Sequence, residues 1–238
     1  MDILWTEKYK PQKSDDILGN NKIIELMQIW LNKLTKNKDV CNYIFLAGSS
    51  GVGKTLTATL VLQEYNYDIH EFNSSNHEKI NDFRNTIDTL SKNVNVLQLM
   101  QNKIQKPAII IDEVGNSYKN KVFDIINKMK KNKKKISIII ICDLSLEKKF
   151  KNLIKNNNFF VFKKPTRKYL NQISNRIIKN ENLNIDKNIL NNIYDYVSYD
   201  YRKLIITLDD LKYNGYIDND VFQEYQKNNI KKKNKTIL

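Results

Sequence analysis

The chain has 238 residues, which is long enough for one large domain and a smaller one. No apolar run approaches membrane-spanning length and no signal-peptide pattern opens the chain, so we expect an intracellular protein that is not secreted and has no membrane partner. The formal net charge of +14 favours a polyanionic partner, nucleic acid first, although free use of Lys and Asn also fits an AT-rich genome. The two cysteines, Cys41 and Cys142, lack metal-ligand spacing, which is typical of a reducing compartment.

Short apolar runs alternate with helical patterns through the first part of the chain. We expect strands at Ile44–Ala47, Tyr67–Phe72, Ala108–Ile111, Ile136–Cys142 and Phe159–Phe162. We expect helices at Lys54–Tyr65, Glu78–Leu90, Asn120–Lys130 and Leu146–Ile154. Strands that alternate with helices predict an α/β fold, in which a parallel sheet carries helices on both faces.

The first expected strand runs directly into a glycine-rich loop that opens a helix. The loop matches every fixed position of the P-loop pattern, with the residues Gly48, Ser49, Ser50, Gly51, Val52, Gly53, Lys54 and Thr55. Glycines let backbone N–H groups turn toward a phosphate, and the start of a helix adds its positive dipole end. Lys54 is expected to reach the β- and γ-phosphates and Thr55 to ligate Mg²⁺. The sequence therefore predicts a nucleoside triphosphate site.

A second motif lies about sixty residues further on, where the apolar run Ala108–Ile111 ends in two acids. This is the pattern of a buried parallel strand whose tip reaches the ligand edge of the sheet. Asp112 can hold the Mg²⁺ shell, and Glu113 can orient or activate the attacking water. Behind a complete P-loop, the pair favours ATP hydrolysis over passive binding, with Glu113 and Lys54 as the catalytic residues.

The strands stop near Pro165 and only helical stripes follow. Apolar residues then recur at helical spacing, at Leu170, Ile173, Ile177 and Ile178, at Ile189, Leu190, Ile193 and Val197, and at Leu204, Ile205, Leu208 and Leu211. Thr166 is a candidate helix cap. We therefore expect a nucleotide-binding α/β core at 1–164, a small all-helical lid at 165–228, and a basic disordered tail at 229–238.

The order of these parts resembles the AAA+ ATPases, and among them the clamp loaders called replication factor C. The opening segments Leu4–Pro11 and Asp15–Asn20 resemble the motif that wraps the adenine in that family. Lys10 stands where the family usually has an Arg that approaches the phosphates, so it keeps the charge but loses the planar fork. Glu71–Asn76 resembles the motif after the second strand, in which the residue matching Asn73 can act as a polar switch on the catalytic Glu.

Within replication factor C, the chain resembles the large subunit most. Small subunits carry a Ser-Arg-Cys motif whose Arg reaches a neighbour's ATP site, and the matching region, Phe150–Phe160, has no Arg. The segments Cys142-Asp143, Phe162–Pro165 and Asp112–Val114 look like those of the large subunit, which receives an arginine finger and donates none. The resemblance therefore implies weak ATP turnover by this chain alone.

Two further nucleotide contacts follow from the resemblance. Asp143 stands where the family normally has an Asn that hydrogen-bonds the γ-phosphate or the attacking water. A carboxylate cannot donate and repels phosphate oxygens, so this departure weakens the expectation of tight hydrolysis sensing. Arg202, which ends the segment Tyr199–Arg202, matches the lid arginine that contacts the nucleotide from above.

The resemblance also implies the partners, which are small clamp-loader subunits, a sliding clamp and primer–template DNA, at a nuclear or cytoplasmic site of DNA replication. Residues near Lys79 and Arg84, and near Lys119 and Lys121, would follow the duplex backbone without reading its sequence. The clamp would contact the region around 118–130. In this scheme ATP binding fixes the core and lid in one orientation, and hydrolysis releases the closed clamp.

Two other interpretations stay open. Clamp-loader subunits usually carry a third helical domain that forms a collar, whereas we expect little beyond a basic tail after Asp218–Gln226. A nucleotide-binding DNA scaffold with little hydrolysis would explain both Asp143 and a missing collar. Another AAA+ DNA-remodelling motor, such as a Holliday-junction motor, would form homohexamers and need its own arginine finger, which the sequence does not reveal.

Overall fold

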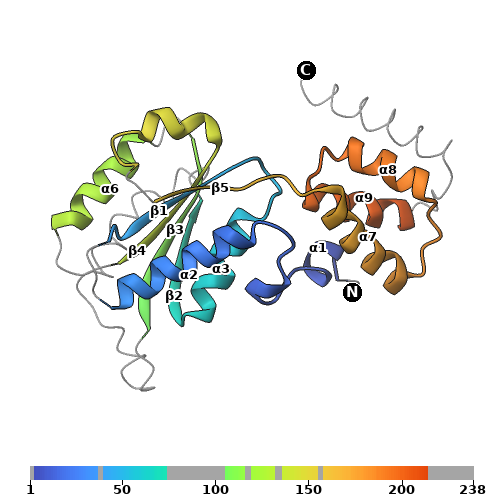
Figure 1. Ribbon diagram of the computed structural model, residues 1–238, viewed down its shortest axis with the longest axis horizontal. Coiled ribbons are helices and arrows are strands. Elements are labelled where there is room, and N and C mark those ends of the chain that lie inside the picture. The colour runs from blue at the N-terminus through green and yellow to red at the C-terminus, as the bar shows by residue number, and fades with distance from the viewer. Residues whose placement is uncertain are drawn as a thin grey trace. The chain divides into compact units, whose positions relative to one another are not determined.

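The computed structural model describes residues 3–36, 40–73, 105–115, 119–131, 136–154 and 158–213. These residues divide into two compact units, which are described separately below (Figure 1). The sheet unit comprises the described residues from Pro11 to Lys163. The helical unit comprises those up to Lys10 together with those from Lys164 onward. This division differs from the core predicted at 1–164, because the opening segment packs with the C-terminal helices.

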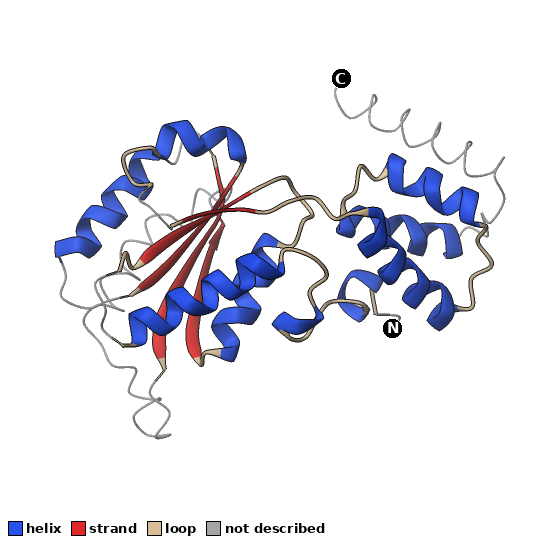
Figure 2. Ribbon diagram, in the orientation of Figure 1, coloured by secondary structure: helices blue, strands red, loops and turns tan. Residues whose placement is uncertain are grey.

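The sheet unit is built on five parallel strands (Figure 2). They lie in the order β2-β3-β4-β1-β5, with the bounds β1 Tyr43–Ala47, β2 Tyr67–Asn73, β3 Lys106–Val114, β4 Ser137–Cys142 and β5 Phe159–Val161. Since every strand runs the same way, their carboxyl ends meet at one edge of the sheet. The predicted α/β fold with a parallel sheet is confirmed.

Alternate residues of the central strands supply two hydrophobic layers. Ile44 and Leu46 of β1 pack toward α2, Asn21–Thr35, and α3, Lys54–Glu64. Phe45 and Ile140 point to the opposite face, which is covered by α6, Lys119–Lys131, and η3, Leu144–Phe150. Residues buried on both faces explain why these strands read as continuous apolar runs. Each buried aliphatic side chain contributes about 1.5–3 kcal/mol relative to its exposed state.

The helices of the sheet unit depart from the sequence prediction at three places. The helix α2 was not predicted, although Met27 and Leu31 on its inner face are fully buried. The helix expected at Leu146–Ile154 is a 3₁₀-helix that begins earlier, at Leu144. A short 3₁₀-turn, η1, occupies Ser14–Asp16. The helix expected at Glu78–Leu90 lies outside the described residues.

The helical unit packs three helices and a short fourth one around a core of its own. The bounds are α1 Trp5–Lys8, α7 Arg167–Glu181, α8 Lys187–Tyr196 and α9 Tyr201–Tyr213. Its buried residues include most of the predicted apolar stripes, together with Trp5 and Tyr9. Thr166 occupies the N-cap position of α7, but its side chain makes no capping hydrogen bond. In the part of the chain that the structure describes, no helix is long and apolar enough to cross a membrane.

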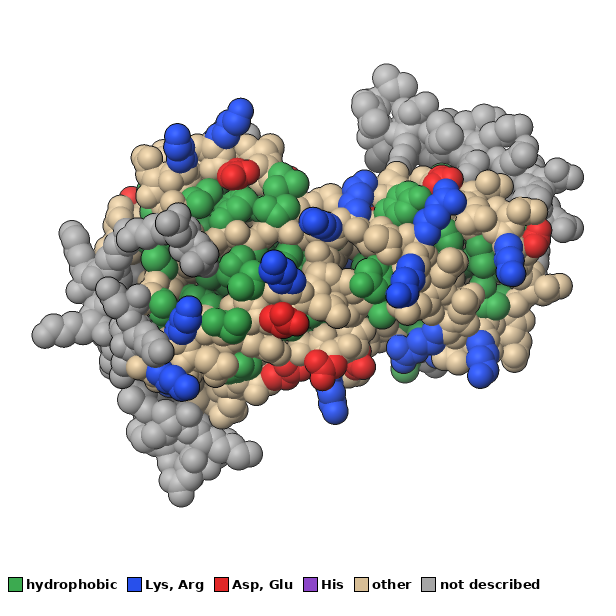
Figure 3. Space-filling view, viewed as in Figure 1, with side chains coloured by type: hydrophobic (Ala, Val, Ile, Leu, Met, Phe, Trp, Pro, Cys, Tyr) green, Lys and Arg blue, Asp and Glu red, His purple; other side chains and the backbone are tan. Residues whose placement is uncertain are grey.

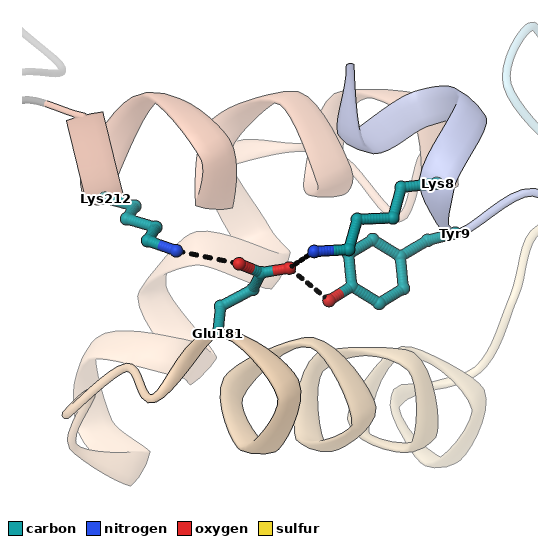
Figure 4. A network of polar contacts seen from close by, with 4 residues as sticks. All are labelled: Lys8, Tyr9, Glu181 and Lys212. Carbon is teal, nitrogen blue, oxygen red and sulfur yellow. Dashed lines mark hydrogen bonds and ion pairs between the residues drawn. The ribbon is translucent and has the colours of Figure 1, made fainter. Parts of the chain in front are cut away.

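A buried carboxylate fastens the opening segment to the helical unit (Figure 4). Glu181 accepts hydrogen bonds from Lys8, from the Tyr9 hydroxyl at 2.6 Å and from Lys212 at 2.7 Å. Its side chain is 6% exposed, so burial disfavours the charge, but the three donors outweigh burial and lower the pKa of Glu181 to about 2. Lys212 also lies over the Trp5 ring, with its Nζ 5.4 Å from the ring centroid.

Candidate functional site

The glycine loop lies between β1 and α3 at the carboxyl edge of the sheet. The Gly48 amide donates to the Cys142 carbonyl at 3.2 Å, which ties the loop to β4. A Cβ on Gly48 would lie 2.9 Å from the Phe162 carbonyl oxygen, so a side chain cannot fit there without displacing backbone. Gly53 holds the N-cap of α3 at φ +91°, a conformation that glycine adopts without strain. The loop therefore requires glycine at Gly48 for space and at Gly53 for its positive φ.

The residues that follow the loop present a cation and a hydroxyl. The Lys54 ammonium donates to the carbonyls of Gly48 at 2.9 Å and Ser49 at 2.7 Å, so it lies over the loop. The Thr55 hydroxyl donates to Asp112 Oδ2 at 2.6 Å. This hydrogen bond joins the start of α3 to the tip of β3. The two motifs that the sequence separates by nearly sixty positions thus lie in contact.

The acidic pair sits on an irregularity of β3. The register of β3 against β4 shifts between Ile111 and Val114, so Asp112 and Glu113 form a bulge. Glu113 has φ +53°, in the left-handed region that non-glycine residues rarely adopt. Its amide donates to Asp112 Oδ1 at 2.7 Å. Asp112 therefore uses one carboxylate oxygen for Thr55 and the other for the backbone of Glu113.

Two more polar residues share this edge. Asn73, at the end of β2, pairs in register with Asp112. Asp143 follows β4 directly and is exposed. Burial raises the pKa of the neighbouring Cys142 thiol to about 12, an effect that the Asp143 carboxylate increases and Lys54 opposes. Asp143 and Lys54 therefore both lie within electrostatic reach of the tip of β4 and of the glycine loop.

These groups fit a nucleoside triphosphate and Mg²⁺. Mg²⁺ prefers oxygen ligands and is usually held by one or two carboxylates together with substrate phosphates. Thr55 and Asp112 offer oxygens of that kind, and the described residues contain no group of three or more His, Cys, Asp or Glu that could hold a metal without phosphate. The glycine backbone, where a Cβ on Gly48 would intrude, provides the close approach that a phosphate requires.

The remaining predicted residues belong to other elements of the chain. Lys10 and Arg202 both belong to the helical unit, where Lys10 is exposed and pairs with Glu7 at 3.4 Å, and Arg202 is exposed on the first turn of α9. Their contact with a nucleotide stays a prediction. Lys79, Arg84 and Tyr118 lie outside the described residues, and Lys119 is described in its backbone only. Lys121 is exposed on α6.

Sequence reasoning missed two features of the site and its surroundings. The left-handed backbone of Glu113 has no signature in the sequence, because the residue is not a glycine. One feature of the sequence pointed to the packing of the opening segment in a hydrophobic core: Trp5 and Tyr9 are four residues apart, as on one face of a helix. Their ring centroids lie 5.9 Å apart in an edge-to-face arrangement.

The fold and the site together define a P-loop nucleotide-binding domain with the AAA fold. The sequence model of the family "ATPase family associated with various cellular activities (AAA)" matches residues 44–161, which span the sheet from β1 to β5. Among solved structures, the chain is similar to the Thermotoga maritima RuvB Holliday junction branch migration motor, with a TM-score of 0.57 and 15% sequence identity. That match covers 91% of this chain and 71% of the other, and it shows the fold alone.

Within that class, the chain is similar to subunits of replication factor C. It is 28% identical over 230 residues to replication factor C subunit 1 of Oryza sativa subsp. japonica, covering 84% of this chain and 22% of that protein. It is 29% identical to the replication factor C small subunit of Saccharolobus solfataricus, covering 86% of this chain and 60% of that protein. Large subunits match as well. The chain spans less than two thirds of the length of these relatives.

Proposed function

We propose that the chain binds ATP with Mg²⁺ and works as a clamp-loader ATPase subunit of the replication factor C type. The contact between the Thr55 hydroxyl and Asp112, at 2.6 Å, carries the proposal, because it places a hydroxyl and a carboxylate together at the start of α3. The relatives named replication factor C support the clamp-loading role. Small clamp-loader subunits, a sliding clamp and primer–template DNA are the proposed partners.

Each residue of the site has a chemical part in this proposal. Lys54 exchanges its bonds to the loop carbonyls for phosphate oxygens and neutralises their charge. Thr55 and Asp112 would hold Mg²⁺, which when bound neutralises the charge on the phosphates. Glu113, at the bulge of β3, orients the attacking water and accepts its proton. From the resemblance, Lys10 and Arg202 would add positive charge at the phosphates.

The nucleotide part of the proposal is tested by binding of a fluorescent ATP analogue in Mg²⁺. Lys54→Ala removes charge-assisted hydrogen bonds worth about 1.5–3 kcal/mol, so the Kd should rise by about ten- to a hundredfold. Lys22→Ala, an exposed lysine on α2, is the matched control and should leave the Kd unchanged. Equal affinity of both variants would contradict the assignment of the site.

Turnover decides between an ATPase and a scaffold. Glu113→Gln should keep ATP binding and abolish hydrolysis, measured as phosphate release with the partner subunits present. Asp143→Asn replaces a repelling carboxylate at the end of β4 with a group that can donate a hydrogen bond, so it should tighten ATP binding. Wild-type turnover that equals that of Glu113→Gln would favour a DNA scaffold in which ATP only orders the fold.

The assembly is tested by recovering the tagged chain from its native host and measuring the native mass of the complex. One copy of this chain with several smaller AAA+ subunits and a clamp is the expected result. A homo-oligomer would instead favour a DNA-remodelling motor, and a monomer on DNA would favour the scaffold.

A further inference from the structure

The outer face of α7 carries positive charge without any acid. Four cations are exposed on this helix; Arg167 pairs with Asp195 of α8 at 3.1 Å, and the other three are Lys168, Arg176 and Lys179. At 100° per residue they fall on the side opposite the buried Leu170 and Ile177. Exposed amide side chains lie between and beside them, at Asn171, Gln172, Asn175 and Asn180. The helix therefore presents one continuous polar and cationic stripe, which we call the α7 stripe.

The absence of acid from the α7 stripe has a structural cause. The single acid of α7, Glu181, is turned inward and is 6% exposed, because it is bound by Lys8, Tyr9 and Lys212 (Figure 4). Its charge is thereby removed from the outer surface. Among the described residues, Lys168, Arg176 and Lys179 form no ion pair. Figure 3 shows basic side chains spread over the visible face of this unit.

Three of the other long helices with exposed lysines differ in this respect, whereas on α9, which carries Lys203 and Lys212, both acids are half-buried. On α2, the exposed Lys22 and Lys33 share the surface with exposed Glu25. On α6, Lys121 is followed by exposed Asp124, and on α8 Lys187 is followed by exposed Asp195. Mixed charge of this kind is the ordinary composition of a solvated helix face. The α7 stripe departs from the pattern of α2, α6 and α8, although the whole chain is rich in lysine.

We propose that the α7 stripe binds the phosphate backbone of a nucleic acid duplex. Lys and Arg supply the charge, and Asn and Gln side chains are further donors that proteins use toward phosphate oxygens. From Lys168 to Lys179 the helix rises about 16 Å, which is long enough to pass more than one phosphate of a strand. The stripe contains no exposed aromatic residue, so it lacks the stacking platform of a single-strand site and the apolar centre of a protein interface.

This inference extends the proposed function, on which it rests for the choice of DNA as partner, by placing a duplex contact on the helical unit. The contacts would be independent of base sequence, since no groove-reading geometry is involved. They would also be independent of ATP hydrolysis. The stripe would add affinity for the duplex to that of any contacts made by the sheet unit.

The test measures binding of the full chain to a fluorescein-labelled duplex by anisotropy over a series of NaCl concentrations. The variant Lys168→Gln/Arg176→Gln/Lys179→Gln removes the three cations and keeps good helix formers. Each phosphate contact contributes about 0.9 to the slope of log Kobs against log[NaCl], so the slope should fall by about 2.7. The matched control, Lys22→Gln/Lys33→Gln/Lys36→Gln on and next to α2, removes the same charge and should change the slope by less than about 1.

Equal slopes for the two triple variants would overturn the proposal, because the loss would then reflect net charge alone. A wild-type chain that binds no duplex would overturn it as well. Binding of the fluorescent ATP analogue is measured on the same variants and should equal wild type. Lys54→Ala should lose ATP binding and keep the wild-type duplex slope, which would show that duplex binding by the α7 stripe does not require ATP binding.

Discussion

The left-handed backbone of Glu113 should affect the free energy of unfolding, independently of any catalytic role of its side chain. At φ +53° an L-residue carries about 1–2 kcal/mol of strain, and a β-branched residue carries about 1 kcal/mol more. Glu113→Gly relieves this strain but adds about 0.5–1 kcal/mol of chain entropy to the unfolded state. The Gly variant should therefore be about 1 kcal/mol more stable than Glu113→Gln, and Glu113→Val about 1 kcal/mol less stable than Glu113→Gln.

Urea unfolding followed by fluorescence measures these differences. At an m-value of about 2 kcal/mol per M, the midpoints of the Gly and Val variants should differ by about 1 M, with m unchanged. All three variants should lose hydrolysis, because each removes the carboxylate. A Gly variant that is more stable than the Gln variant is the result expected when the backbone at this position is strained.

A matched series at Asp143 provides the control. Asp143 has φ −81° and ψ 154°, an extended backbone that Val adopts without strain, whereas Gly has no strain to relieve there and loses more chain entropy on folding. The order should therefore reverse there, with Asp143→Val more stable than Asp143→Gly. The same order at both positions, or no difference at Glu113, would refute the argument that the bulge holds Glu113 in a strained conformation.

Two further predictions concern packing and pH. Gly48→Ala should destabilise the sheet unit by about 1–3 kcal/mol and weaken ATP binding, because its Cβ would lie 2.9 Å from the Phe162 carbonyl oxygen. Urea midpoints measure the first effect and binding of the ATP analogue measures the second. An unchanged midpoint would contradict the close approach. Glu181 has its pKa lowered to about 2 on folding, so its contribution to stability is complete above about pH 4.5 and is lost as the pH falls toward 2. Unfolding midpoints of wild type and Glu181→Gln should therefore differ at pH 6 and converge near pH 2, and a constant gap would exclude the ionic contribution.

Local sequence patterns were sufficient for the sheet and for locating the glycine loop and the acidic pair in it. The apolar runs of β1, β3 and β4 are buried on both faces, so their hydrophobicity alone marked them as central parallel strands. The P-loop is contiguous, and its glycines are required by the backbone itself. That is why the loop and the positions of Lys54 and Thr55 could be predicted from residue types and spacing alone; the parallel topology then brings the Thr55 hydroxyl to Asp112.

The sequence was less informative where a helix depends on distant partners. The helix α2 was missed because its apolar residues are not in a continuous run and gain their burial only against α3 and the sheet. The opening residues were assigned to the core, yet Trp5 and Tyr9 lie in the core of the helical unit. Chain order alone cannot tell which of two hydrophobic cores a short segment will join.

The sequence by itself determined that this chain has a P-loop followed by a strand that carries Asp112 and Glu113 near its carboxyl end, because both motifs are local and are recognised by residue type and spacing. Tertiary structure decided the left-handed bulge at Glu113 and the inward turn of Glu181, which leaves α7 with a purely cationic face. The bulge depends on the shifted pairing of β3 with β4, and the inward turn of Glu181 depends on hydrogen bonds that Lys8, Tyr9 and Lys212 donate only when the chain is folded.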